Sequence, residues 1–101
     1  MPHGIIATVP MPIDMYRAVN AKLMEKYGDS PMDGLLVHIC RPTSDGFQVI
    51  EIWESKQQSD HFQDTMLAPI IDEVSGGQAP PREDITEEFE TENFMAGPAP
   101  A

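Results

Sequence analysis

Alternation between apolar and polar side chains is clearest in the middle of the chain. Residues 35–41 (LLVHICR) and 47–54 (FQVIEIWE) are rich in β-branched and aromatic side chains, which predicts two β-strands. Residues 42–46 between them contain Pro, Ser, Asp and Gly, a composition typical of a turn. The two strands are therefore expected to form an antiparallel hairpin. A third run, at residues 5–9 (IIATV), predicts a short buried strand that Pro10 ends.

Two further stretches have apolar side chains at the spacing of a helix. The first predicts a helix that begins with Asp14 as its N-cap and ends near Lys26. The second follows Ser55 and Gln58, which fit a capping box in which the serine side chain accepts the amide hydrogen of the glutamine. Pro69 interrupts this second helix and predicts a break or kink just before it, because proline has no amide hydrogen and clashes with the preceding turn.

The order of these elements predicts the fold. Residues 82–92 hold six acidic side chains against Arg82 alone. The four-residue spacing of Ile85 and Phe89 allows a strand or a helix, and the length and Thr content favour a last, edge-like strand. The order β-α-β-β-α-β indicates an α+β, ferredoxin-like fold with an antiparallel sheet and both helices on one face. Right-handed crossovers are expected to place strand 5–9 beside strand 47–54 and parallel to it. The other sheet face is left uncovered, so it needs a partner or a ligand.

The length and charge of the chain narrow its domains and partners. Residues 1–95 are expected to form one domain, followed at 96–101 by a disordered tail of Ala, Gly and Pro. Acidic residues number 17 and basic residues 6, which gives a formal net charge of −11. Because phosphate binding requires Lys and Arg, we expect no nucleic-acid partner and no anionic membrane surface.

Cysteine usage and the chain start indicate the compartment. The single cysteine, Cys40, cannot form an intrachain disulfide, and the His and acidic residues show no metal-binding motif. We therefore expect no metal and no cofactor. The first residues lack the features of a signal peptide, and no apolar run approaches the roughly 18 residues of a membrane-spanning helix. These features predict a cytoplasmic protein.

Alternate residues of a strand point to opposite faces of its sheet, so the hairpin can be divided by parity. The drier face, which we expect the helices to cover, receives the apolar set Leu35, Val37, Ile39, Ile50 and Ile52. His38, Glu51 and Trp53 then share the uncovered face. The register that achieves this places His38 opposite Glu51 and Leu36 opposite Trp53.

His38 and Glu51 are the candidate catalytic residues. A carboxylate beside an imidazole favours its protonated form, and such a pair suits proton abstraction from a weak acid such as a phenol or an enol. Trp53 offers a flat apolar surface for stacking on an aromatic ligand. The same residues also have a purely structural explanation, because a cross-strand His–Glu pair can be a satisfied polar pair and Trp53 can pack in the core or in a dimer interface.

The segment 49–55 (VIEIWES), followed by Phe62, Leu67 and Pro69, resembles the antibiotic biosynthesis monooxygenase-like domains of the dimeric α+β-barrel superfamily. Residues 34–38 (GLLVH) are similar to small members of the actinobacterial type. The resemblance implies a homodimer in which two subunits pack their uncovered sheet faces into a barrel, each with its own pocket between sheet and helices. It also implies kinship with cofactor-independent oxygenases of anthrone- or quinol-like aromatic polyketides, with haem-degrading enzymes, and with isomerases or cyclases.

The family's functional residues match this chain only in part. Trp53 matches the family's Trp of the third strand, which lies at the pocket in several members. The haem-degrading branch has a His in the second helix where this chain has Gln63, so we expect no haem. Small relatives end the last strand with His-Asn, and the matching pair here is Glu92-Asn93. The expected substrate-binding residues are Trp53, Leu36, Thr8, Phe62 and Asn93.

These residues and the resemblance lead to one functional expectation with two alternatives. We expect a cofactor-independent oxygenase that deprotonates an aromatic or polyketide-type phenol or enol, whose carbanion then reacts with O2. His38 would be the base, Glu51 its orienting group and Trp53 the stacking wall. One alternative is an oxygen-independent isomerase or cyclase that uses the same proton transfer. The other is a non-catalytic dimer that binds a small hydrophobic or aromatic molecule, so the sequence leaves open whether the chain is an enzyme.

Overall fold

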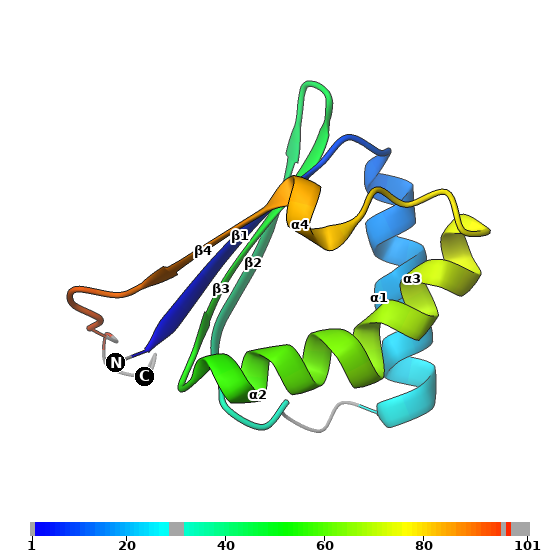
Figure 1. Cartoon of the computed structure of the whole chain (residues 1–101). Coiled ribbons are helices and arrows are strands. Elements are labelled where there is room, and N and C mark those ends of the chain that lie inside the picture. Colours follow the sequence, from blue (N-terminus) through cyan, green and yellow to red (C-terminus); the bar gives the residue numbers. More distant parts are fainter. Residues whose placement is uncertain (1, 29–31, 96, 98–101) are drawn as a thin grey trace.

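One face of a β-sheet carries the helices (Figure 1). The computed structural model describes residues 2–28, 32–95 and 97, and in them four strands form the sheet: β1 (His3–Val9), β2 (Leu35–Thr43), β3 (Gly46–Trp53) and β4 (Thr86–Glu90). The helical elements are α1 (Ile13–Tyr27), α2 (Lys56–His61), η1 (Phe62–Leu67), α3 (Ala68–Ser75) and α4 (Arg82–Ile85). The tail predicted at 96–101 lies outside the described residues except for Gly97.

The sheet has the strand order β2-β3-β1-β4, and all three neighbouring pairs are antiparallel. The predicted element order, hairpin and antiparallel sheet are confirmed. The expectation that β1 runs parallel to β3 is wrong. The α1 crossover makes β1 and β2 run in the same direction, and the hairpin makes β3 run against β2. A strand that lies between β1 and β2 is therefore antiparallel to both.

The hairpin register is confirmed at its centre, where His38 pairs with Glu51. It is wrong at its end, because Leu35 rather than Leu36 lies opposite Trp53. A β-bulge between Leu35 and Val37 causes this shift. The bulge adds one residue to β2, and this residue, Leu36, has no partner on β3. Leu36 is consequently an exposed side chain on the edge strand β2.

The helices begin largely where the sequence indicates. The Ser55 side chain accepts the backbone amide of Gln58 at 3.2 Å, which confirms the capping box. The chain does not leave the helix before Pro69, where a break or kink was predicted; instead the hydrogen-bond pattern changes there from the π-helical η1 to α3. Asp14 lies in the first turn of α1 and is not its N-cap, because the helix begins at Ile13 and Pro12 holds the N-cap position. Proline has a fixed φ that suits the start of a helix.

The acidic segment at 82–92 contains both of the elements that its sequence allows. Its first part forms one helical turn, α4, rather than the favoured strand, and only Thr86–Glu90 pairs with β1 as β4. The turn begins after Pro81, whose carbonyl accepts the amide of Asp84 at 3.0 Å. A proline preceding the first turn favours this local helix over an extended chain.

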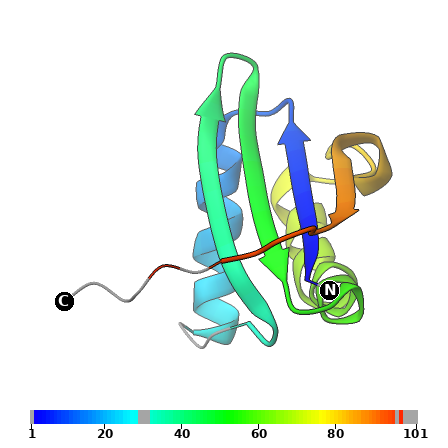
Figure 2. The same ribbon diagram turned by 90° about the vertical axis from the view of Figure 1, so that its left-hand side faces the viewer.

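The two sheet faces are the reverse of the predicted assignment. Glu51 and Trp53 lie on the helix-covered face, where Glu51 is 5% exposed and Trp53 is fully buried between sheet and helices. The uncovered face is turned toward the viewer in Figure 2. Its apolar side chains include Ile39, which is 48% exposed, together with the half-buried Ile50 and Ile52. The parity grouping therefore holds beyond the bulge, but the helices cover the other set, and Leu35 joins that set because it lies opposite Trp53 and packs on the core.

Candidate functional site

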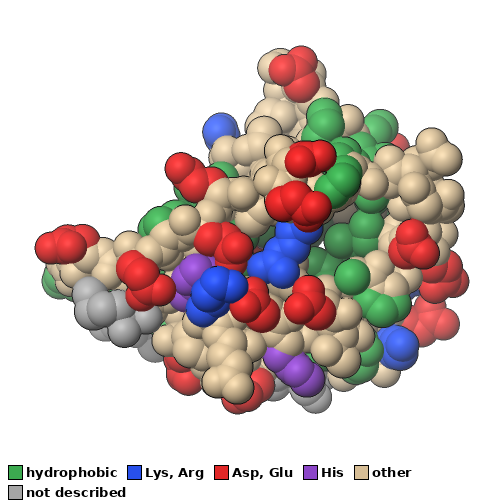
Figure 3. Space-filling model, in the orientation of Figure 1, with side chains coloured by type: hydrophobic (Ala, Val, Ile, Leu, Met, Phe, Trp, Pro, Cys, Tyr) green, Lys and Arg blue, Asp and Glu red, His purple; other side chains and the backbone are tan. Residues whose placement is uncertain are grey.

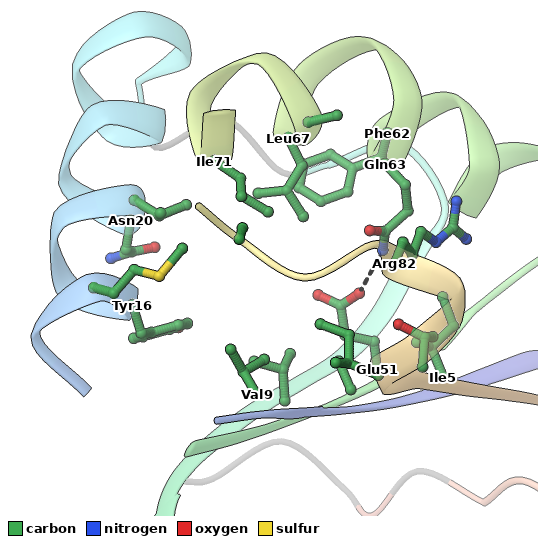
Figure 4. A pocket seen from close by; sticks show the side chains of 18 of the residues that line it. Ile5, Val9, Tyr16, Asn20, Glu51, Phe62, Gln63, Leu67, Ile71 and Arg82 are labelled. Carbon is green, nitrogen blue, oxygen red and sulfur yellow. Dashed lines mark hydrogen bonds between the residues drawn. The ribbon is translucent and has the colours of Figure 1, made fainter. Parts of the chain in front are cut away.

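A cavity of about 360 Å³ lies between the helix-covered face of the sheet and the helices. Its walls come from β1, β2, β3, α1, η1, α3 and the segment that leads into β4 (Figure 4). Its apolar lining comprises Ile5, Ala7, Val9, Met15, Val19, Leu23, Phe47, Val49, Phe62, Leu67, Ala68, Ile71, Ala79, Pro80 and Ile85. Its polar lining comprises Tyr16, Asn20, His38, Glu51, Gln63, Asp64, Asp72, Arg82 and Thr86. A mostly apolar cavity with a few converging polar groups is typical of small-molecule sites.

A chain of hydrogen bonds runs along one wall of this cavity. The Tyr16 hydroxyl lies 2.7 Å from Nε2 of His38, and Nδ1 of His38 lies 2.7 Å from Oε2 of Glu51. The other carboxylate oxygen of Glu51, Oε1, accepts the indole N–H of Trp53 at 3.1 Å. The same oxygen accepts the side-chain amide of Gln63 at 3.5 Å (Figure 4). Both oxygens of the buried carboxylate are thus occupied.

The chemistry of these partners determines which nitrogen carries the hydrogen when the histidine ring is neutral. A carboxylate oxygen only accepts hydrogen bonds, so Nδ1 of His38 carries a hydrogen that it donates to Glu51. In the neutral ring Nε2 then carries a lone pair, which accepts the hydroxyl hydrogen of Tyr16. His38 is therefore fully hydrogen-bonded as a neutral imidazole that can still accept a proton.

Burial and neighbouring charge change the titration of the tyrosine. Burial raises the pKa of Tyr16 above its ordinary value, and Cys40 and Glu51 raise it further by repelling the phenolate. Tyr16 is consequently a neutral phenol at physiological pH, in agreement with its role as the donor to His38. The side chain also packs against Phe47, with ring centroids 5.7 Å apart, which holds it at the cavity wall.

The structure brings some of the predicted site residues together and leaves others apart. His38, Glu51 and Phe62 line the cavity. Trp53 lies directly behind Glu51, packed on Phe62 with ring centroids 5.3 Å apart, and is not among the described residues that line the cavity. Trp53 therefore does not offer a stacking surface in this cavity, and its indole N–H instead holds the Glu51 carboxylate in place.

The remaining three predicted residues lie away from this cavity. Leu36 is at the bulge of β2, and Asn93 is exposed beyond the end of β4. Thr8 is exposed on β1, where its hydroxyl accepts the side-chain amide of Gln48 at 3.2 Å. Because of the reversed faces and the bulge, these side chains do not reach the wall formed by His38 and Glu51.

Sequence reasoning missed Tyr16 as a site residue. Its partner His38 is 22 residues away in another element, so the sequence around Tyr16 does not indicate the contact. Gln63 was considered only as a departure from the haem-degrading pattern, yet it contacts Glu51. Nothing in the local pattern signals either contact, since both depend on how the helices pack over the sheet.

The cavity mouth carries a network of charged side chains. Arg82 lies at the cavity and contacts three carboxylates, those of Asp60 at 3.2 Å, Asp64 at 3.5 Å and Glu88 at 3.4 Å. Lys56 hydrogen-bonds Asp60 at 2.6 Å, and this contact lowers the pKa of Asp60. Figure 3 shows acidic and basic side chains side by side around the hollow on this face. Because acids outnumber bases at the mouth, the cavity favours uncharged or cationic ligands over anions.

Two further structural features concern metals and membranes. Within residues 2–28, 32–95 and 97, His, Cys, Asp and Glu side chains do not gather in groups of three or more that could hold a metal ion. None of the helices in this described part of the chain combines the length and apolar character needed to cross a membrane.

Comparisons with known proteins identify the fold. No protein-family sequence model matches the chain, and no curated protein has a matching sequence. The crystal structure of a protein from Chloroflexus aurantiacus J-10-fl, assigned as an antibiotic biosynthesis monooxygenase, matches with a TM-score of 0.61 and 19% identity, covering 95% of this chain and 98% of that one. Rv0793 from Mycobacterium tuberculosis matches with a TM-score of 0.59 and 14% identity, covering 95% of this chain and all of the other.

A third solved structure is SnoaB, a cofactor-independent oxygenase from Streptomyces nogalater, with a TM-score of 0.47 and 13% identity over 95% of this chain and 96% of that one. At that score the likeness supports no argument. The first two likenesses confirm that the chain has the fold of antibiotic biosynthesis monooxygenase-like proteins. At these identities they show the fold alone, and the activity has to be argued from the site.

Proposed function

We propose that this protein binds an aromatic or polyketide-type phenol or enol between its sheet and helices and removes a proton from it with the His38–Glu51 pair. The resulting carbanion then reacts with O2 without a cofactor. The observation that carries the proposal is the 2.7 Å contact between His38 and the buried carboxylate of Glu51, in the wall of a mostly apolar cavity. A positioned base and an apolar, water-poor site are what such a deprotonation requires.

The proton reaches His38 through Tyr16. The Tyr16 hydroxyl occupies Nε2 of His38 at 2.7 Å, so the acidic O–H or C–H group of a ligand in the cavity meets the tyrosine oxygen first. Tyr16 passes its own proton to Nε2 and receives the proton of the ligand, which leaves the tyrosine unchanged. Glu51 then stabilises the imidazolium across its 2.7 Å contact with Nδ1.

The oxidation balances without an external reductant. An anthrone-type substrate loses one proton from its CH2 group and becomes an aromatic enolate. The enolate gives one electron to O2, and the two radicals combine to a peroxide that takes the proton back from His38. The hydroperoxide loses water to leave a carbonyl, so the net change is CH2 plus O2 to C=O plus H2O. Both electron pairs that reduce O2 come from the substrate.

The size and polarity of the cavity support this ligand class. A volume of about 360 Å³ lies within the roughly 300–1,000 Å³ of typical ligand pockets. Phe62 and Phe47 supply aromatic surface on opposite walls, one from η1 and one from β3. Aromatic rings prefer offset or edge-to-face contacts with such side chains, which favours a planar ligand.

Oxygen uptake by the purified, chelator-treated protein across a panel of anthrones, quinols and hydroxyquinones tests the proposal. We expect protein-dependent uptake that is lost in His38→Gln and retained in His61→Gln. His61 is a suitable control because it is exposed on α2 and, unlike its neighbour Phe62, does not line the cavity. Product formation under argon would show that the protein is an isomerase or cyclase and not an oxygenase. Ligand binding without turnover would identify a binding protein.

We also propose that a second copy of this chain covers the uncovered sheet face. Apolar side chains gather there, among them Ile39, Ile50 and Ile52. A large exposed apolar patch is unfavourable in water, which supports a self-complementary interface. Light scattering is expected to show a dimer that Ile39→Asp dissociates. Met24→Asp is the matched control, because Met24 is 46% exposed but lies on α1.

A further inference from the structure

The hydroxyl of Tyr16, the imidazole of His38 and the carboxylate of Glu51 form a linear array. Each contact is 2.7 Å long, and the histidine uses its two ring nitrogens for the two neighbours. A hydroxyl bonded to a histidine that a carboxylate orients is the arrangement by which proteins activate a nucleophile. The array comes from three elements, α1, β2 and β3, that converge at the cavity wall.

The proton relay leaves the oxygen of Tyr16 without a covalent role. That oxygen nevertheless lies at the wall of a cavity with space for a small molecule, and it has a base at hydrogen-bond distance. The only other tyrosine, Tyr27, lies at the end of the same helix and does not line the cavity in the described part of the chain. The two tyrosines therefore differ in position, because Tyr16 lies at the cavity wall beside a base and Tyr27 does not line the cavity.

We propose that Tyr16 is an acyl acceptor, with His38 as its base and Glu51 as the orienting group, and that the cavity accepts small uncharged aryl esters. This activity is distinct from the oxygenase reaction, since it needs neither O2 nor an acidic ligand. It uses the same hydrogen-bonded array with a different electrophile in the cavity.

The protonation state of Tyr16 makes the base necessary. Burial, with the nearby Cys40 and Glu51, raises the pKa of Tyr16, so the free phenolate is scarce at neutral pH. A neutral hydroxyl attacks only if its proton is removed during the attack, as in the hydrolases that use serine. The lone pair on Nε2 of His38 is in place to take that proton.

The acyl transfer balances with the groups present. The Tyr16 oxygen forms a bond to the carbonyl carbon of the ester, and the bond from that carbon to the aryl oxygen breaks. The tyrosine proton moves to Nε2 of His38 and from there to the departing aryloxide. Water then attacks the tyrosyl ester with His38 as base, the acid leaves, and the proton returns to Tyr16.

Three further polar residues of the cavity bear on this reaction. Asn20 lies one helical turn after Tyr16 and lines the same cavity (Figure 4), where its side-chain amide can donate to the developing oxyanion. Asp64 and Asp72 also line the cavity and disfavour an anionic ester. The expected substrates are accordingly uncharged esters such as p-nitrophenyl acetate.

Peptide-level mass spectrometry after brief exposure to p-nitrophenyl acetate tests the proposal within one molecule. We expect the acetyl group at Tyr16 to appear about 100-fold faster than at Tyr27, the range of a positioned general base. His38→Gln is expected to reduce the rate at Tyr16 to that at Tyr27, whereas His61→Gln leaves it unchanged. The proposal is overturned if Tyr16 and Tyr27 react at equal rates in the unaltered protein.

A second readout holds even if His38→Gln fails to fold. Stopped-flow release of p-nitrophenolate by the unaltered protein is expected to show a burst, which Tyr16→Phe abolishes and Tyr27→Phe retains. A burst that survives Tyr16→Phe would refute the acyl-acceptor role. Both measurements run under argon, so their failure leaves the oxygenase proposal standing, and the absence of oxygen uptake leaves this one standing.

Discussion

Two histidines on this sheet bind carboxylates, and they differ in their second partner. His38 on β2 contacts Glu51 through one ring nitrogen and the Tyr16 hydroxyl through the other, both at 2.7 Å. His3 on β1 contacts Glu88 at 2.8 Å through Nε2 and Glu90 at 3.4 Å through Nδ1. His38 lines the cavity, whereas His3 is 4% exposed and is not part of the lining.

The second partner decides what each ring can do. The phenol of Tyr16 can donate or accept, so His38 keeps all its hydrogen bonds both as a neutral ring and as a cation. Ionised carboxylates only accept, so His3 faces two acceptors and links β1 to β4. The hydroxyl beside His38 is compatible with the proposed role as a base, whereas the two carboxylates around His3 favour a structural role.

The largest expected effect tests this division on turnover. His38→Gln is expected to lower the turnover of a confirmed substrate by about 10²- to 10⁴-fold, the usual contribution of a general base. His3→Gln is expected to change turnover little, because His3 does not reach the cavity. The measurement is kcat for both variants with matched circular dichroism spectra. An equal loss of turnover in both variants would contradict the assignment of different roles to His38 and His3.

The next effect tests the division on stability. His3→Gln is expected to lower the free energy of unfolding by about 1–3 kcal/mol, because the contacts of the buried imidazole with two carboxylates of β4 are lost. Urea unfolding measures this change. The exposed His61→Gln serves as control, with an expected change below about 0.5 kcal/mol. An unchanged midpoint in His3→Gln would mean that the cross-link contributes nothing.

The same contrast explains how far the sequence determines the site. Strand alternation is local, so the pairing of His38 with Glu51 could be predicted from the hairpin pattern. Which face the helices cover could not, because both parity sets contain large apolar side chains, such as Ile50 in one and Trp53 in the other. An uncovered sheet face with apolar side chains has the same sequence pattern as a sheet face that packs against helices.

The partners of both histidines were beyond the reach of local patterns. Tyr16 meets His38 only because α1 packs over β2, and His3 meets Glu88 across 85 residues of sequence. The bulge at Leu36 changed the register by one residue, which periodicity alone does not reveal. Contacts between distant segments are set by packing, so the fold class was predictable and the second partner of each ring was not.

A smaller effect sharpens the role assigned to Tyr16. Tyr16→Phe removes one hydrogen bond to His38 but leaves the Glu51 contact and the ring packing on Phe47 intact. We expect turnover to fall about two- to tenfold, the value of one hydrogen bond, because the ligand can then reach Nε2 directly. Tyr27→Phe is the control. A loss as large as that of His38→Gln would mean that the proton cannot bypass the tyrosine.

The smallest effect is a titration that reports on the surroundings of His38. Burial, Cys40 and Glu51 raise the pKa of Tyr16, so the folded protein holds the phenol proton more tightly than the unfolded chain does. The resulting stability is complete below the unfolded value near 10 and is lost as the pH rises through the folded value. The tyrosinate absorbance that disappears in Tyr16→Phe is therefore expected to titrate at higher pH in the folded protein than in denaturant. If it titrates at lower pH when folded, the tyrosine oxygen is a phenolate that accepts a hydrogen bond from Nε2 of a charged His38 ring, and His38 could not then serve as the base.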